Sequence, residues 1–181
     1  MPRLFLLRHA KSSWDDSALD DFSRPLNLRG RAAGPLMGRH IADHGLLPER
    51  VLCSSARRTR DTFAAILPYL AGDFDARFLG RLYQASAADY LDLIRKEGGK
   101  ARTLLMIGHN PAIQEAALSL IGLGNPELKA MIGEKFPTAA LAMIDFDGEW
   151  SRVTAASGRI VAFFRPRELE AVDATAPEVD E

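Results

Sequence analysis

The chain has 181 residues and a mass of 19.9 kDa, which suits one α/β domain. Hydrophobic residues make up 47% of it and charged residues 26%, which excludes a disordered, collagen-like or coiled-coil protein. A formal net charge of −1 and a single cysteine, Cys53, argue against a nucleic-acid partner, a disulfide framework and a cysteine-rich metal site. No apolar stretch reaches the ~18 residues of a membrane span, and the apolar run at the start is too short for a secretory signal. We therefore expect a cytoplasmic protein with no membrane partner.

The first part of the chain predicts a buried strand, a long loop and a helix. Leu4–Leu7 is a fully apolar run, which is typical of a strand covered on both faces. Residues 11–25 are polar and rich in aspartate and serine, and they predict a loop of a length that is usually functional or mobile. Asn27 is a suitable cap for the helix that follows, and Gly45 ends that helix.

The middle of the chain predicts a second strand and two helices. Val51–Cys53 is a short buried strand. Ser54 or Ser55 opens the next helix, and Pro68 is expected to kink or break it. A further helix over residues 86–98 begins at a serine–aspartate capping pattern and ends at a pair of glycines.

The last part of the chain repeats the alternation. Thr103–Ile107 is the third buried strand, and Asn110 caps the helix after it. Asn125 opens a short helix by the same signal, and later strands are predicted over Ala139–Phe146 and Arg159–Phe164. Strands that alternate with helices predict an α/β fold with a mostly parallel central sheet.

One domain is expected, followed by an acidic tail. We place a single domain at residues 1–167 and a disordered tail at residues 168–181. The last eleven residues carry four acids and no base, namely Asp173, Glu178, Asp180 and Glu181.

Candidate functional residues follow three of the predicted strands. In a parallel sheet, ligands bind beyond the carboxyl ends of the strands. The three ends are Arg8-His9, Ser54–Arg58 and Gly108–Asn110. Two of the four histidines of the chain lie at these ends. The sequence therefore predicts one site that the three ends share.

The residues at these ends suit an anion. Arg8 ends a hydrophobic strand, where a guanidinium group needs an anionic partner. Arg57, Arg58 and Arg60 lie in the first turn of a helix, where bases are disfavoured unless an anion compensates them. The alternative is a solvated basic face, which we expect for at least one of Arg57 and Arg60. His109 precedes a helix whose exposed amides form a ready anion site.

Several other chemistries lack their motifs. A serine hydrolase would need a Gly-x-Ser-x-Gly elbow, and a nucleotide site would need a Gly-x-x-x-x-Gly-Lys loop; the chain has neither. It also lacks the His-x-Glu motif and the clustered carboxylates of metal sites, so we expect no metal and no cofactor. What remains is a nucleophilic histidine that attacks a phosphoryl group while arginines neutralise its oxygens.

The motifs at the strand ends resemble those of a known family. Residues 6–10, Leu-Leu-Arg-His-Ala, resemble the Arg-His-Gly signature of the histidine phosphatase superfamily, in its phosphoglycerate-mutase-like branch. Ser54, Arg58 and Thr62 fit the family's Ser-x-x-x-Arg-x-x-x-Thr pattern, and Gly108-His109 fits its late Gly-His. These elements occur in the family's order and with its spacing.

Within that superfamily, the small SixA-type phosphohistidine phosphatases are the most similar group. The likeness lies in Asp21–Leu26, Leu82–Ser86 and Gly108–Pro111, and it extends roughly over residues 3–166. It implies a three-layer α/β/α sandwich around a mostly parallel central sheet.

The resemblance also implies roles for individual residues. His9 resembles the nucleophile that is transiently phosphorylated, with one ring nitrogen donating to a backbone carbonyl so that the other stays free. The other residues to which the resemblance gives a phosphate-binding role are Arg8, Arg58, His109, Arg24 and Asn110.

Two departures from the family pattern bear on the substrate. Ala10 replaces the usual glycine of the motif. The stretch Phe78–Gln84, where many members carry a glutamate general acid, has no carboxylate, and Tyr83 is the one weak acid there. Loss of the acid affects alkyl phosphates most, because an alkoxide leaves poorly without a proton. The sequence therefore favours phosphohistidine on a partner protein.

Two alternatives remain open. One is a phosphatase of a small phosphoester or nucleotide metabolite, with an acid supplied by the loop. The candidates for that acid are Asp15, Asp16, Asp20 and Asp21. The other is a non-catalytic module that binds a phosphorylated partner, against which intact His9 and His109 argue.

Overall fold

The computed structural model describes residues 1–173, in which strands and helices alternate along most of the chain. The strands are β1 (Arg3–Arg8), β2 (Arg50–Ser54), β3 (Asp75–Leu79), β4 (Thr103–Gly108), β5 (Ile121–Gly124), β6 (Leu141–Phe146) and β7 (Gly158–Phe164). The helices are α1 (Leu28–Asp43), α2 (Arg57–Ile66), α3 (Ala87–Glu97), α4 (Ala112–Leu120), α5 (Pro126–Glu134) and α6 (Pro166–Asp173). Short 3-10 turns are η1 (Leu67–Tyr69), η2 (Gly80–Leu82) and η3 (Trp150–Arg152).

Within the described residues, the seven strands form one sheet in the order β3-β2-β4-β1-β6-β7-β5. β1 lies in the middle and pairs in parallel with β4, which in turn pairs in parallel with β2. β3 adds to β2, and β5 to β7, also in parallel, whereas β6 runs antiparallel to both β1 and β7. The prediction of a mostly parallel sheet is confirmed.

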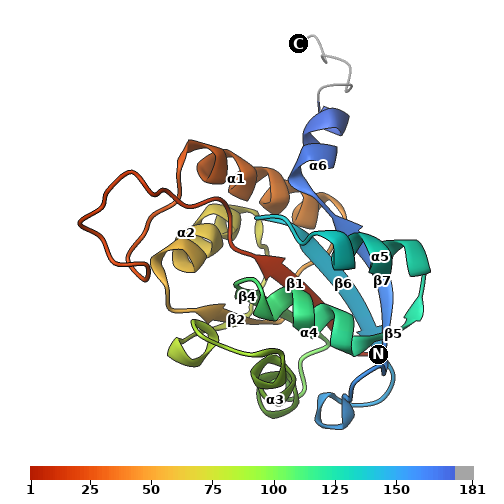
Figure 1. The fold of residues 1–181 in the computed structure, drawn as a ribbon. Helices are drawn as coiled ribbons and strands as arrows, with labels where there is room; N and C mark the ends of the chain where they lie inside the picture. Colours follow the sequence, from red (N-terminus) through yellow and green to blue (C-terminus); the bar gives the residue numbers. More distant parts are fainter. Residues whose placement is uncertain (174–181) are drawn as a thin grey trace.

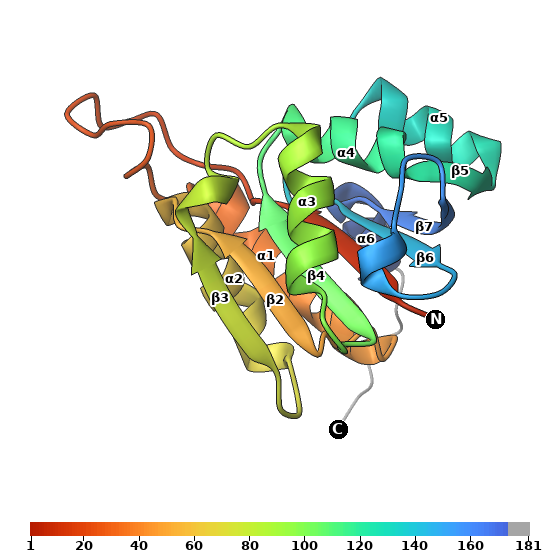
Figure 2. The same ribbon diagram turned by 90° about the horizontal axis from the view of Figure 1, so that it is seen from below.

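Side chains of β1 alternate between two hydrophobic cores, one on each face of the sheet. Leu4 and Leu6 pack in the core that contains residues of α3, α4 and α5, and Phe5 and Leu7 pack in the core that contains residues of α1 and α2. α6 joins the second layer, where it contacts α1 (Figure 1). The two helical layers are seen on either side of the sheet in Figure 2. Because both faces are covered, the central strands are continuous apolar runs, and the predicted α/β/α sandwich is confirmed.

Local signals place several helix ends correctly. The Asn27 side chain caps α1 by accepting a hydrogen bond from the Gly30 N–H at 2.9 Å. Ser86 and Asp89 form the expected capping box at the start of α3. α2 ends before Pro68, where η1 takes over.

Two predicted helix caps are wrong. Ser54 is the last residue of β2, and α2 begins after Ala56 with no side-chain cap. Asn110 precedes α4, but its side-chain amide donates to Gln114 Oε1 and to the carbonyl oxygen of Phe136 instead of capping the helix. In both cases the side chain has a tertiary partner that the local sequence does not reveal.

The two edge strands are absent from the predicted elements. β3 carries Asp75 and Arg77 and is largely exposed, so it has no apolar run. β5 follows α4 directly and contains Gly122 and Gly124, which are poor strand formers.

The end of the described chain differs from the expected tail. α6 includes residues 168–173, which the sequence assigns to the disordered tail, and this helix packs against α1. The expected boundary at residue 167 is therefore corrected for these residues. The rest of the expected tail, residues 174–181, lies outside the described residues. Between residues 1 and 173, no helix combines the length and the apolar character that crossing a membrane requires.

Candidate active site

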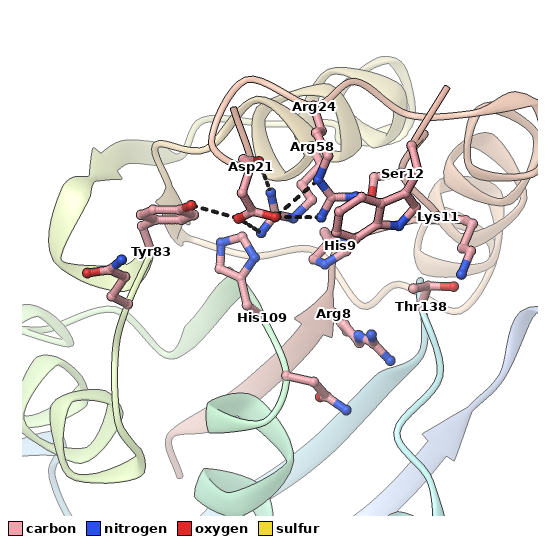
Figure 3. A pocket seen from close by; sticks show the side chains of 13 residues that line it. Arg8, His9, Lys11, Ser12, Asp21, Arg24, Arg58, Tyr83, His109 and Thr138 are labelled. Atoms are coloured by element: carbon pink, nitrogen blue, oxygen red, sulfur yellow. Dashed lines mark hydrogen bonds and ion pairs between the residues drawn. The ribbon is translucent and has the colours of Figure 1, made fainter. Parts of the chain in front are cut away.

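The carboxyl ends of β1 and β4 meet at a pocket of about 530 Å³, which Arg58 of α2, the helix after β2, also lines (Figure 3). Further walls come from the loop between β1 and α1, from the segment after η2 and from the segment before β6. The pocket brings together the six residues that the sequence analysis singles out, which are His9, Arg8, Arg58, His109, Arg24 and Asn110. The ring centroids of the two histidines are 5.2 Å apart.

His9 is held as a neutral imidazole with one free nitrogen. It follows β1 directly and is 7% exposed, and its Nδ1 lies 2.7 Å from the carbonyl oxygen of Ala10. Because a carbonyl oxygen only accepts, Nδ1 donates this bond and Nε2 keeps its lone pair. Burial first, and then the charges of His109, Arg58 and Arg8, lower the pKa of His9 to about 3, although the hydrogen bond to the Ala10 carbonyl opposes the shift. At neutral pH this side chain is therefore in the form that attacks phosphorus.

The loop after His9 is tied to α2. Ala10 is fully buried, so the methyl group at this position is accommodated by packing. The Ala10 N–H donates to Thr62 Oγ1 at 2.9 Å, and the Thr62 hydroxyl donates to the carbonyl oxygen of Arg58 at 2.6 Å. The threonine of the Ser-x-x-x-Arg-x-x-x-Thr pattern thus helps to fix the backbone that orients His9.

Arg8 and Arg58 bring two guanidinium groups to the pocket. Arg8 donates to the carbonyl oxygen of Phe136 at 2.8 Å, and Arg58 donates to the carbonyl oxygen of Asp21 at 2.6 Å and to its carboxylate at 3.1 Å. Among the described residues, the buried Nε of each arginine has no hydrogen-bond partner. Burial and the charge of Arg58 lower the pKa of Arg8. An anion in the pocket would accept hydrogen bonds from the two guanidinium groups and reduce the repulsion between their charges.

His109 lies between β4 and α4 and is 7% exposed. Its Nε2 lies 2.8 Å from the hydroxyl oxygen of Ser54, at the end of β2, so this serine orients the ring instead of capping a helix. The buried Nδ1 has no partner in the part of the chain that the structure describes. Burial, and then the charge of Arg58, lower the pKa of His109 to about 4, so this ring is also neutral at neutral pH.

A carboxylate from the long loop lies at the pocket mouth. Of the four aspartates in the loop that the sequence left open, Asp21 lines the pocket. It accepts hydrogen bonds from the Tyr83 hydroxyl at 2.6 Å, from Arg24 at 2.8 Å and from Arg58 at 3.1 Å (Figure 3). These donors, Tyr83 first, lower the pKa of Asp21 to about 2, so the carboxyl group is ionised. Arg24 is buried and also donates to Ser12 Oγ at 2.8 Å.

The three arginines at the start of α2 have different surroundings. Arg58 lines the pocket, whereas Arg57 and Arg60 do not and are exposed. Arg57 forms an ion pair with Asp61 at 3.7 Å. The reading of a solvated basic face therefore holds for two of the three.

Sequence reasoning misses part of the pocket lining. Lys11, Ser12, Trp14, Gln84 and Thr138 also line it. Of these, Trp14 can be singled out from the sequence as a partner contact or an anchor, because it is a large aromatic residue in a polar loop. Trp14 is 72% exposed, and the guanidinium carbon of Arg24 lies 3.5 Å from its ring centroid.

Comparisons with known proteins place this arrangement in a family. No family model matches the chain. The chain is 33% identical over 163 residues to an uncharacterized protein of Mycobacterium tuberculosis, a match that covers 89% of the chain and 100% of the relative. Its structure superposes on that of a candidate phosphohistidine phosphatase, SixA, from Agrobacterium tumefaciens with a TM-score of 0.78 at 30% identity, covering 92% of this chain and 99% of the other. The chain belongs to the histidine phosphatase superfamily.

The structure of a second SixA candidate supports the same family assignment. The structure from Nakamurella multipartitia gives a TM-score of 0.80 at 25% identity and covers 91% of this chain and 96% of the other. The phosphoglycerate-mutase-like fold that the sequence motifs imply is thereby confirmed.

The lowered histidine pKa values predict that acid destabilises this histidine phosphatase. The pKa of His9 is about 3 in the folded protein against 6.5 for an ordinary histidine, so the unfolded chain binds the proton first as the pH falls. Stability is therefore full above the unfolded pKa and decreases as the pH falls toward the folded one. We expect His9→Ala to remove this penalty, gaining up to about 3 kcal/mol relative to the unmodified protein between pH 8 and pH 4. Urea denaturation of both proteins at the two pH values measures the difference, and a difference independent of pH would contradict the lowered pKa.

Proposed function

We propose that this protein is a phosphatase that forms a transient phosphohistidine on His9 and hydrolyses phosphohistidine on a partner protein. The observation that carries the proposal is the surroundings of His9, whose free Nε2 shares one pocket with Arg8, Arg58 and His109. The name of the SixA relative from Agrobacterium tumefaciens supports the same substrate.

Two displacements at phosphorus make up the proposed reaction. Nε2 of His9 forms a bond to phosphorus while the bond to the leaving group breaks, and the electron pair of that bond moves to the leaving atom. Water then attacks phosphorus, the bond to His9 breaks, and inorganic phosphate is released with one proton. Arg8 and Arg58 neutralise the phosphoryl oxygens in both steps, so the scheme needs no metal ion.

The protonation states in the pocket favour a leaving group that needs no general acid. Asp21 is ionised, and its hydrogen bond raises the pKa of the Tyr83 hydroxyl. His9 and His109 are neutral. An alkoxide leaves poorly under these conditions, since general acid catalysis is typically worth about 10²–10⁴ in rate. An imidazole can take its proton from solvent near neutral pH.

Trp14 supports a protein substrate. Its ring is 72% exposed, yet it is held by the guanidinium group of Arg24 at 3.5 Å. An ordered, exposed aromatic ring beside the phosphate pocket is the kind of contact that protein interfaces use. A protein substrate is large enough to cover this ring while its phosphoryl group lies in the pocket.

A comparison of two substrates tests the proposal. The first is a histidine-containing protein phosphorylated chemically with phosphoramidate, and the second is a sugar phosphate, both assayed with EDTA present. We expect kcat/KM to be at least about 10²-fold higher for the phosphohistidine protein, because the sugar alkoxide lacks a proton donor. Comparable values for the two would favour a phosphatase of small phosphoesters. Binding of the phosphoprotein without release of phosphate would favour a non-catalytic module.

A further inference from the structure

We propose that the Asp21 carboxylate selects the leaving group by accepting a hydrogen bond from the distal ring N–H of a substrate phosphoimidazole. This inference rests on the proposed function and adds the atom of the enzyme that recognises the group attached to phosphorus. Asp21 would thus determine specificity between nitrogen-linked and oxygen-linked phosphoryl groups.

The place of the leaving group follows from the place of the nucleophile. In a displacement at phosphorus, the attacking and leaving atoms lie roughly in line. His9 is on the buried floor of the pocket, so the leaving group points away from it, toward the mouth. The Asp21 side chain is 47% exposed and lines this mouth. In the view of Figure 3, it lies on the opposite side of His9 from Arg8.

The carboxylate is arranged to accept hydrogen bonds rather than to donate a proton. Its Oδ1 accepts from Nε and Nη2 of Arg24, and its Oδ2 accepts from Arg58 and from the Tyr83 hydroxyl. A phosphate that binds Arg24 and Arg58 competes for their N–H groups and so frees lone pairs of Asp21 for a new donor. The exposed half of the side chain leaves room for that donor.

An N–H at this place distinguishes an imidazole from an alcohol or a phenol. With a proton on the distal nitrogen of the phosphoimidazole, Nε2 of His9 bonds to phosphorus as the phosphorus–nitrogen bond breaks. The electron pair returns to the ring, and neutral imidazole leaves with its N–H intact. Asp21 favours this protonated form of the substrate. An oxygen leaving group offers the carboxylate no N–H and develops negative charge, which the carboxylate repels, so the site combines an attractive and a repulsive element.

The variant Asp21→Asn tests the inference with two small probes, phosphoimidazole and 4-nitrophenyl phosphate. Asparagine keeps the shape of the side chain and loses its charge. We expect kcat/KM for phosphoimidazole to fall about 10- to 100-fold more than kcat/KM for 4-nitrophenyl phosphate, the range of a hydrogen bond to a charged group. The ratio cancels any effect on phosphate binding that both probes share. Asp20→Asn is the matched control, since Asp20 is exposed, lies outside the pocket and accepts a backbone bond that asparagine can keep.

Other outcomes distinguish a different role of Asp21 from a failure of the proposed function. An equal fall for both probes would show that Asp21 only positions Arg58, and would overturn the inference while leaving the proposed function intact. The same loss of preference in Tyr83→Phe, which keeps the carboxylate, would assign the selection to the phenol and also overturn it. If the unmodified protein hydrolyses neither probe, the proposed function fails, and this inference fails with it.

Discussion

Replacing His9 with alanine is expected to lower kcat for 4-nitrophenyl phosphate by roughly 10⁴- to 10⁶-fold, the loss seen when an enzyme nucleophile is removed. The reason is that the first displacement needs the free Nε2 that the bond between Nδ1 and the Ala10 carbonyl secures. Steady-state assay of the purified variant measures the effect.

The matched control for this variant is His44→Ala. His44 is exposed at the end of α1 and lies outside the pocket. We expect this control to keep its activity. If His9→Ala keeps a substantial part of the rate, the reaction runs through another nucleophile.

Replacing Arg58 with alanine is the second large expected effect. We expect kcat/KM to fall by about 10²–10³-fold, as when a donor that stabilises developing charge is lost. Arg58 is 6% exposed and lines the same pocket as His9 and Arg8, so its guanidinium group is placed to meet the phosphoryl oxygens. Lysine at this position keeps the charge without the planar fork, and we expect it to recover only part of the loss.

Arg57→Ala provides the comparison within the same helical turn. The Arg57 side chain is 48% exposed and pairs with Asp61, away from the pocket lining. Its loss is expected to change kcat/KM much less than the loss of Arg58. A larger effect at Arg57 would show that the register of α2 against the pocket is assigned wrongly.

Much of the fold follows from features that are local in the sequence. Leu4–Leu7 is apolar at every position because β1 contributes side chains to both cores, and this pattern predicts a central strand. The carboxyl ends of parallel strands lie at one edge of the sheet, so the sequence alone places His9 and His109 in one site. The edge strand β3 could not be predicted this way, since its exposed side chains include Asp75 and Arg77.

The mouth of the pocket depends on tertiary contacts that no local pattern encodes. Asp21 could not be chosen among the acids of the loop, because the loop is held by Arg58 on the Asp21 carbonyl and by the Arg57 N–H on the Phe22 carbonyl. Ser54 fits a helix cap by residue type, but its hydroxyl group is hydrogen-bonded to His109, which follows the neighbouring strand β4. Motif spacing predicts the residues that we propose bind phosphate, whereas it cannot show which other side chains line the mouth of the pocket.

Transfer of phosphate to His9 is the central step of the proposed mechanism. Rapid mixing with 4-nitrophenyl phosphate, quenching in alkali and mapping of the phosphorylated peptide locate the adduct directly. We predict an acid-labile, base-stable phosphate on the peptide that contains His9, and none on that peptide in His9→Ala. Phosphate on a serine, or on the peptide that contains His109, would contradict the account.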